Sequence, residues 1–120
     1  MAFDWREYLS LARSLSGQSG VTYAREAAHR SAVSRAYYAA FCHARNYAEA
    51  HLGFVPSKQY EDHGRLKQHL EQQRMAGPAR QLDRLRQSRN RCDYDDQVHG
   101  LAGLVTSAIR QADSVIKQLT

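Results

Sequence analysis

The sequence predicts an all-α protein, an up-and-down bundle of four to five helices. Alanine supplies 17 of the 120 residues, whereas glycine and proline together supply only nine, and this composition favours helices over strands and long loops. In several segments apolar residues recur with spacings of three, four and seven, as one buried face of a helix requires. The length predicts a single helical domain that covers residues 1–120.

The first helix is expected to follow Asp4, which forms with Glu7 a D-x-x-E pattern typical of a capping box. Its buried face is predicted to contain Trp5, Tyr8, Leu9, Leu11, Ala12 and Leu15. The glycines at 17 and 20 end it. A second helix is predicted from about residue 22 to residue 52, because no glycine or proline interrupts that stretch. A helix of that length extends about 45 Å.

Two faces of the second helix differ in character. One has the pattern of a core, made by Val33, Tyr37, Phe41, Ala44 and Ala48. The neighbouring face carries Ser31, Arg35, Tyr38, Cys42 and Arg45, of which Cys42 is expected to be a small core residue. Arg35 lies in an alanine-rich stretch and has two interpretations. Either its stem packs across the alanines with the charge in solvent, or the charge is buried and paired with a carboxylate.

Three further helices are predicted in the second half of the chain. The third covers about residues 58–75 after a cap at Ser57, and its sparse apolar residues, Tyr60, Leu66, Leu70 and Met75, place it at the edge of the domain. Pro78 lies in the first turn of the fourth, whose apolar stripe is Leu82, Leu85 and Cys92. Residues 93–96, DYDD, end this helix or distort its last turn. The last helix covers residues 101–119, with an apolar face made by Leu101, Leu104, Val105, Ala108, Ala112, Val115, Ile116 and Leu119.

Several classes of protein are excluded by the sequence. No apolar run reaches the roughly 20 residues that span a bilayer, and the opening MAFDWREYLS has two acids where a signal peptide has basic residues. Two cysteines make no disulfide framework, so we expect a cytoplasmic protein with reduced thiols and no membrane partner. The six histidines lack the spacing of a metal motif and no phosphate-binding glycine loop occurs. We therefore expect neither a metal nor a cofactor.

The positive charge is concentrated in one segment. The chain carries a net charge of +5, and residues 74–91 contain six arginines and one acid, Asp83, which also gives +5 (6 − 1). The remaining residues therefore balance. A guanidinium forms a planar fork that matches phosphate, which a lysine does not provide. This segment predicts a partner that carries phosphates, such as RNA or a nucleotide.

The densest polar cluster follows directly, in residues 86–96, RQSRNRCDYDD. Arg89 and Asp93 are four residues apart, as are Arg91 and Asp95, so each pair could meet on the surface of a helix. One interpretation is structural: these are ordinary ion pairs at a helix end, or Asp93 or Asp95 neutralises Arg35.

The functional interpretation is a polar pocket between the second and fourth helices. Its floor would be Arg35, Tyr38 and Tyr94, and it would open towards Arg89 and Asn90. The candidate binding residues are Arg35, Tyr38, Arg86, Arg91, Asp93 and Asp95, and the candidate catalytic residues are Arg89, Asn90 and Tyr94.

Two segments resemble signatures of a known family. Residues 34–41, SRAYYAAF, and residues 85–95, LRQSRNRCDYD, are similar to motifs of small prokaryotic HEPN-domain proteins, with Cys92 where alanine is usual. The opening FDWREYL, residues 3–9, also fits the first helix of that family. The resemblance covers nearly the whole chain. It implies a helical bundle that forms a homodimer, with the polar segments of the two copies facing a shared cleft.

The resemblance also implies a class of activity. Many HEPN proteins are metal-independent endoribonucleases, often toxins paired with a small nucleotidyltransferase antitoxin, and their catalytic motif is an arginine followed after four to six residues by a histidine. Arg89 and Asn90 match its beginning, but Tyr94 stands where the first permitted histidine would be, and His99 comes after nine intervening residues. A histidine titrates near pH 6.5 and serves as acid or base, whereas a tyrosine near pKa 10 is a poor base.

Three hypotheses follow. In the first, the protein is a dimeric HEPN module without the catalytic histidine, which binds RNA, a nucleotide or a nucleotidyltransferase partner in a toxin–antitoxin or defence system. In the second, it is an active metal-independent endoribonuclease in which Arg89 stabilises the phosphorane and Tyr94, Asp93 or the partner subunit's His99 transfers protons. In the third, it is a structural helical adaptor in which Arg35 and its carboxylates form only an ion-pair network.

Overall fold

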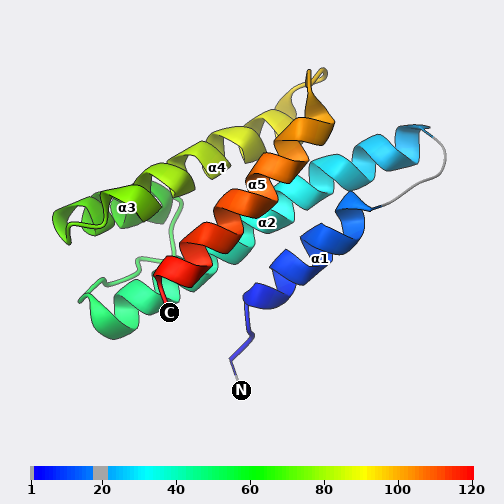
Figure 1. The fold of residues 1–120 in the computed structure, drawn as a ribbon. Helices are drawn as coiled ribbons and strands as arrows, with labels where there is room; N and C mark the ends of the chain where they lie inside the picture. Colours follow the sequence, from blue (N-terminus) through cyan, green and yellow to red (C-terminus); the bar gives the residue numbers. More distant parts are fainter. Residues whose placement is uncertain (1, 18–21) are drawn as a thin grey trace.

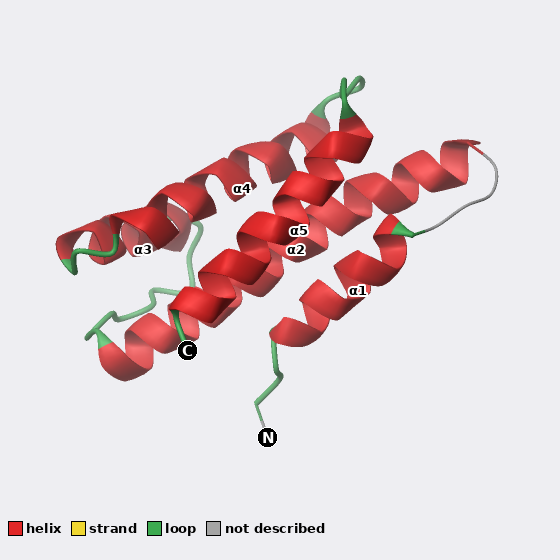
Figure 2. Cartoon of the chain, in the orientation of Figure 1, coloured by secondary structure: helices red, strands yellow, loops and turns green. Residues whose placement is uncertain are grey.

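Five helices make up the fold, in a computed structural model that describes residues 2–17 and 22–120, the latter with side chains from residue 25 onward (Figure 1). They are α1 (Arg6–Ser16), α2 (Thr22–His51), α3 (Asp62–Gln72), α4 (Ala76–Tyr94) and α5 (Leu101–Gln118). Figure 2 shows helices joined by loops, and no strand occurs in the two ranges described. The prediction of an all-α bundle is confirmed.

The long helix α2 is the centre of the bundle, and α1, α4 and α5 pack along it (Figure 1). Its alanines at 32, 36, 39, 40, 44 and 48 are completely buried. Because the distance between packed helices depends on the side chains at the contact, alanines on several faces let neighbouring helices approach α2 from more than one side. All five residues predicted for its core face are buried. The helix ends before Gly53, whose φ of +72° turns the chain in the left-handed region that glycine favours.

Two details of α1 differ from the prediction. The capping box is not formed: the Asp4 carboxylate accepts from the backbone N–H of Arg6 at 3.0 Å and from its guanidinium at 2.7 Å, and Trp5 is the N-cap residue. Leu9 is buried as expected, but Leu11 is 43% exposed. Two residues correspond to about 200° around a helix, so Leu11 lies nearly opposite Leu9.

Helix α3 is shorter than predicted, because Asp62 organises the segment before it. The Asp62 carboxylate accepts from the Ser57 hydroxyl at 2.6 Å and from the backbone N–H groups of Ser57 and Lys58 at 3.0 and 2.9 Å. These bonds hold residues 58–61 in a bend and a turn, so the helix begins at Asp62 rather than at residue 58. Tyr60, predicted as part of the apolar face, is therefore 71% exposed.

The last two helices agree with the sequence patterns. In α4, Pro78 is the third residue, Leu82, Leu85 and Cys92 are buried, and the helix ends at Tyr94. The apolar face of α5 packs into the core: Val105, Ala108, Ala112, Val115, Ile116 and Leu119 are buried, while Leu101 and Leu104 are partly buried. Helix α3 packs mainly on α4 and runs antiparallel to it, at the edge of the bundle.

The structure also describes the state of the two cysteines and the character of the helices with respect to a membrane. Cys42 and Cys92 are free thiols, and burial raises the pKa of each; Cys42 is a core residue, as predicted. None of the helices described combines the length and the apolar character needed to cross a membrane.

Candidate functional site

Arg89 lies at the centre of the candidate site, on the side of α4 that faces α2. Its guanidinium carbon is 5.3 Å from the centre of the Tyr38 ring and 5.6 Å from the centre of the Tyr94 ring. Its Nη1 donates to Oδ1 of Asn90 at 2.9 Å, and its Nε is 2.9 Å from Oδ2 of Asp93. The Arg89 side chain is 16% exposed. The structure thus brings together five residues that the sequence singled out, with the Arg89 guanidinium near both rings.

The guanidinium of Arg89 is not fully satisfied by these contacts. The short distance to Asp93 is an ion pair without a directed hydrogen bond, since the buried Nε–H finds no well-aligned acceptor among the described residues. Within the same part of the chain, Nη2 has no hydrogen-bond acceptor. A partly buried guanidinium with an unused donor favours an added anion.

Arg35 does not pair with the carboxylates of this segment, so the interpretation in which Asp93 or Asp95 neutralises it is wrong, whereas the ion pair of Arg89 with Asp93 is present. Its guanidinium carbon lies 4.8 Å from the centre of the Tyr8 ring and 5.4 Å from that of Tyr38. No ion pair to Asp93 or Asp95 occurs among the residues that the structure describes. The physical reason is register: Asp93 lies one turn from Arg89 and pairs with it, while aromatic faces on α1 and α2 accommodate Arg35 by cation–π contact.

Arg30, which the sequence analysis did not identify, holds the end of α4. Its Nη1 donates to the carbonyl oxygens of Cys92 at 3.0 Å and Asp95 at 2.6 Å, and its Nη2 donates to that of Asp96 at 3.0 Å. The last carbonyl groups of a helix lack partners within the helix, and a cation there is favourable. Arg30 therefore fixes the segment that presents Tyr94. Only the fold brings it there, from more than sixty residues earlier.

Arg86 lies about one turn before Arg89 on α4 and, like Arg89, packs against a tyrosine ring. Its Nη2 donates to the Tyr60 hydroxyl at 2.7 Å, and its guanidinium carbon lies 5.2 Å from the centre of the Tyr60 ring. Residues three apart on a helix are neighbours, so Arg86 lies beside Arg89. Tyr60 and Tyr94 are 71% and 72% exposed. We call these four residues, Tyr60, Arg86, Arg89 and Tyr94, the tyrosine–arginine row.

A histidine that the sequence analysis did not single out lies next to this row. His63, on α3, shares a hydrogen bond through Nδ1 with the Tyr37 hydroxyl, and its ring stacks on Phe41 with 4.4 Å between ring centres. Burial lowers the pKa of His63, and the nearby charges of Arg86 and Arg89 lower it further. Burial raises the pKa of Tyr37. At neutral pH the pair is therefore an uncharged imidazole and a protonated phenol.

The other predicted site residues lie apart from this cluster. Arg91 and Asp95 are exposed, and within the described part of the chain they form no ion pair with each other. His99 is exposed in the connection between α4 and α5. Among the residues described, no three His, Cys, Asp or Glu side chains gather where they could hold a metal ion.

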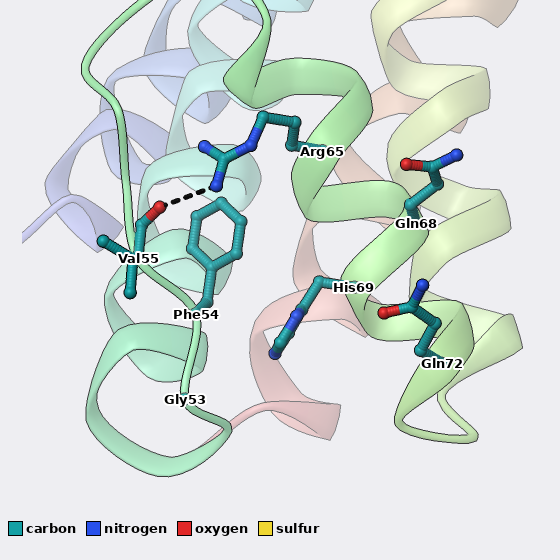
Figure 3. Close-up of a pocket in the computed structure, with 7 residues that line it drawn as sticks. All are labelled: Gly53, Phe54, Val55, Arg65, Gln68, His69 and Gln72. Carbon is teal, nitrogen blue, oxygen red and sulfur yellow. Dashed lines mark hydrogen bonds between the residues drawn. The ribbon is translucent and has the colours of Figure 1, made fainter.

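A separate pocket of about 280 Å³ lies between the loop after α2 and α3 (Figure 3). There Arg65 stands over the Phe54 ring, at 5.1 Å, and donates to the Val55 carbonyl at 2.9 Å. Nε2 of His69 is 2.6 Å from the Leu52 carbonyl oxygen. These polar groups fasten the loop to α3, so their role is packing.

Comparisons of the chain with family models, with curated proteins and with solved structures find no match.

Proposed function

We propose that this protein is a dimeric, cytoplasmic HEPN-type module that binds single-stranded RNA through the tyrosine–arginine row. The resemblance of residues 34–41 and 85–95 to HEPN signatures supports the assignment to that family. The concentration of the whole net charge of +5 in residues 74–91 supports a ligand with phosphates.

The observation that carries the proposal is that two exposed rings, Tyr60 and Tyr94, flank two neighbouring arginines, Arg86 and Arg89, in the row. Proteins that bind single strands combine a cationic track for the backbone with aromatic faces on which bases stack. Arg86 and Arg89 supply the cations side by side, and Tyr60 and Tyr94 supply rings that are more than two-thirds exposed.

The test is fluorescence anisotropy with a labelled single-stranded RNA at low salt. The wild type is expected to bind, and Tyr94→Ala is expected to lose about fivefold to a hundredfold in affinity, the usual effect of removing one stacking ring. Arg89→Ala should weaken binding comparably. Arg110→Ala, which removes an exposed arginine from α5, is the matched control and should leave binding unchanged. No binding by the wild type, or equal binding by all four proteins, contradicts the proposal.

The dimer and the partner are separate parts of the proposal. Light scattering at micromolar concentration is expected to give the mass of two chains, and the mass of one chain counts against a shared cleft. A small nucleotidyltransferase that co-purifies with the tagged protein would support a toxin–antitoxin or defence role.

A second candidate function, a metal-independent endoribonuclease, is favoured by His63. RNA cleavage without a metal needs a group that takes the proton of the 2′-hydroxyl, and an imidazole that is neutral at pH 7 is suited to it. Induction of the wild type, Arg89→Ala and His63→Gln in a bacterium discriminates. Growth arrest and RNA fragments with the wild type alone support cleavage. Equal growth and intact RNA in all three reject it.

A further inference from the structure

We propose that Tyr60 and the groove between α3 and α4 form a second base-binding position, so that the ligand is an oligonucleotide of two or more residues rather than a mononucleotide. This proposal rests on the proposed function and extends it. The first position would be at Tyr94, beside Arg89. The second would be at Tyr60, beside Arg86.

The groove has the size of a ligand site and opens beside the row. Its volume is about 630 Å³, within the roughly 300–1,000 Å³ typical of small-molecule pockets. Tyr60 and Arg86 both line it, with Gly64 and Gln68 from α3 and Asp83 from α4. A side chain placed at Gly64 would meet no atom within 4 Å, which shows open space along the first turn of α3.

The charges in the groove suit a base rather than a phosphate. Three cations line it, Arg65, Lys67 and Arg86, together with three acids, Glu61, Glu71 and Asp83. The positive and negative charges in the groove are therefore equal in number, and Nζ of Lys67 lies 3.9 Å from Oδ2 of Asp83. An uncharged, polar, planar group gains hydrogen bonds and stacking in such a place without electrostatic opposition, whereas a phosphate favours the arginine side of α4.

The spacing of the two arginines connects the two positions. Arg86 and Arg89 are three residues apart on α4, which separates their Cβ atoms by about 5–6 Å. Consecutive phosphates of one extended strand could follow that track. The flanking rings, Tyr60 and Tyr94, then stand where consecutive bases would stack.

The test compares affinities for a mononucleotide, a dinucleotide and a trinucleotide with the full chain. The affinity of the wild type is expected to be about tenfold or more higher for the dinucleotide than for the mononucleotide, a gain that comes from the second base. Tyr60→Ala should abolish that gain, whereas Tyr60→Phe, which keeps the ring, should retain most of it. Because Tyr60 is exposed, the alanine variant is expected to fold, which circular dichroism verifies.

A second pair of variants tests the groove itself. Gly64→Leu fills it and should also abolish the gain, while Gly64→Ala should not. Gly103→Leu is the matched control, since Gly103 likewise lies on a helix with open space around it but on α5, and it should behave as the wild type. The second position is refuted if Tyr60→Ala and Gly64→Leu keep the full gain with length. That outcome differs from failure of the proposed function, in which the wild type binds none of the three ligands.

Discussion

The guanidinium of Arg30, in the N-terminal third of the bundle's central helix, lies 2.6 Å from the carbonyl oxygen of Asp95, the first residue after α4. The same guanidinium also donates to the carbonyl oxygens of Cys92 and Asp96, so Arg30 connects α2 to the end of α4. Since Tyr94 lies between these carbonyl groups in the chain, the position of one ring of the row depends on a residue of α2 that is more than sixty positions earlier in the sequence.

Removing Arg30 is expected to destabilise the protein more than removing an exposed arginine. Arg30→Met takes away the donors of three carbonyl groups and should lower the free energy of unfolding by about 2–3 kcal/mol. Arg25→Met, an exposed arginine on the same helix, should lower it by less than about 0.5 kcal/mol. Urea unfolding of both variants measures the difference. Equal effects of the two substitutions would show that the hydrogen bonds of Arg30 to the end of α4 add nothing to the stability of the protein.

Arg35 is expected to tolerate replacement. Its charge stacks on Tyr8 and Tyr38 without a carboxylate partner, so Arg35→Met should cost about 1 kcal/mol or less, as for a cation–π contact with some exposure. Its removal would cost about 3–5 kcal/mol if a buried ion pair were broken. Thermal or urea unfolding decides between the two, and a loss in the larger range would restore the ion-pair interpretation.

Asp62 makes stability depend on pH in the acid range. Burial raises its pKa, but hydrogen bonds from Ser57, Lys58 and Arg65 outweigh burial and lower it to about 2. A carboxyl group with a lowered pKa contributes stability that is complete above the ordinary value of 3.8 and is lost as the pH falls towards 2. Asp62→Asn should cost roughly 2 kcal/mol at pH 7 and remove this dependence. Unfolding curves at pH 7, 4 and 2.5 test it; parallel losses in both proteins would disprove the role.

His63 makes stability depend on pH in a second window. Its pKa is lowered by burial and by Arg86 and Arg89, against the opposing charge of Asp62, so the unfolded chain binds the proton more readily than the folded one. Stability should therefore be complete above about pH 6.5 and should decrease as the pH falls below it. An NMR titration is expected to place the His63 midpoint below 6.5. A midpoint at or above 6.5 contradicts the environment described.

Local patterns predicted most of the fold, because they depend on neighbours along the chain. The apolar spacing of α5 and the glycine-free stretch of α2 gave bounds within one residue. The predicted start of α3 was wrong because the Asp62 carboxylate accepts hydrogen bonds from Ser57 and Lys58. These bonds compete with helix formation in residues 58–61. The prediction that Leu11 is buried was wrong because spacings of three and four alone do not determine where the centre of a buried face lies.

The candidate site was predictable only in part, for a physical reason. Arg89, Asn90 and Asp93 lie within one turn of a single helix, so their spacing in the sequence determines that they meet. Arg30 and His63 reach the same region from α2 and α3, and their roles depend on how helices pack rather than on spacing. No linear motif marks either residue.

The salt dependence of RNA binding tests the central claim most directly. For a single strand, log K is expected to fall with log salt with a slope of about −0.7 for each phosphate neutralised. Arg89→Ala should reduce the slope of the wild type by about 0.7, because one phosphate contact is lost, while Arg110→Ala should leave it unchanged. A wild-type slope near zero, or the same slope in all three proteins, would contradict a phosphate site at Arg89.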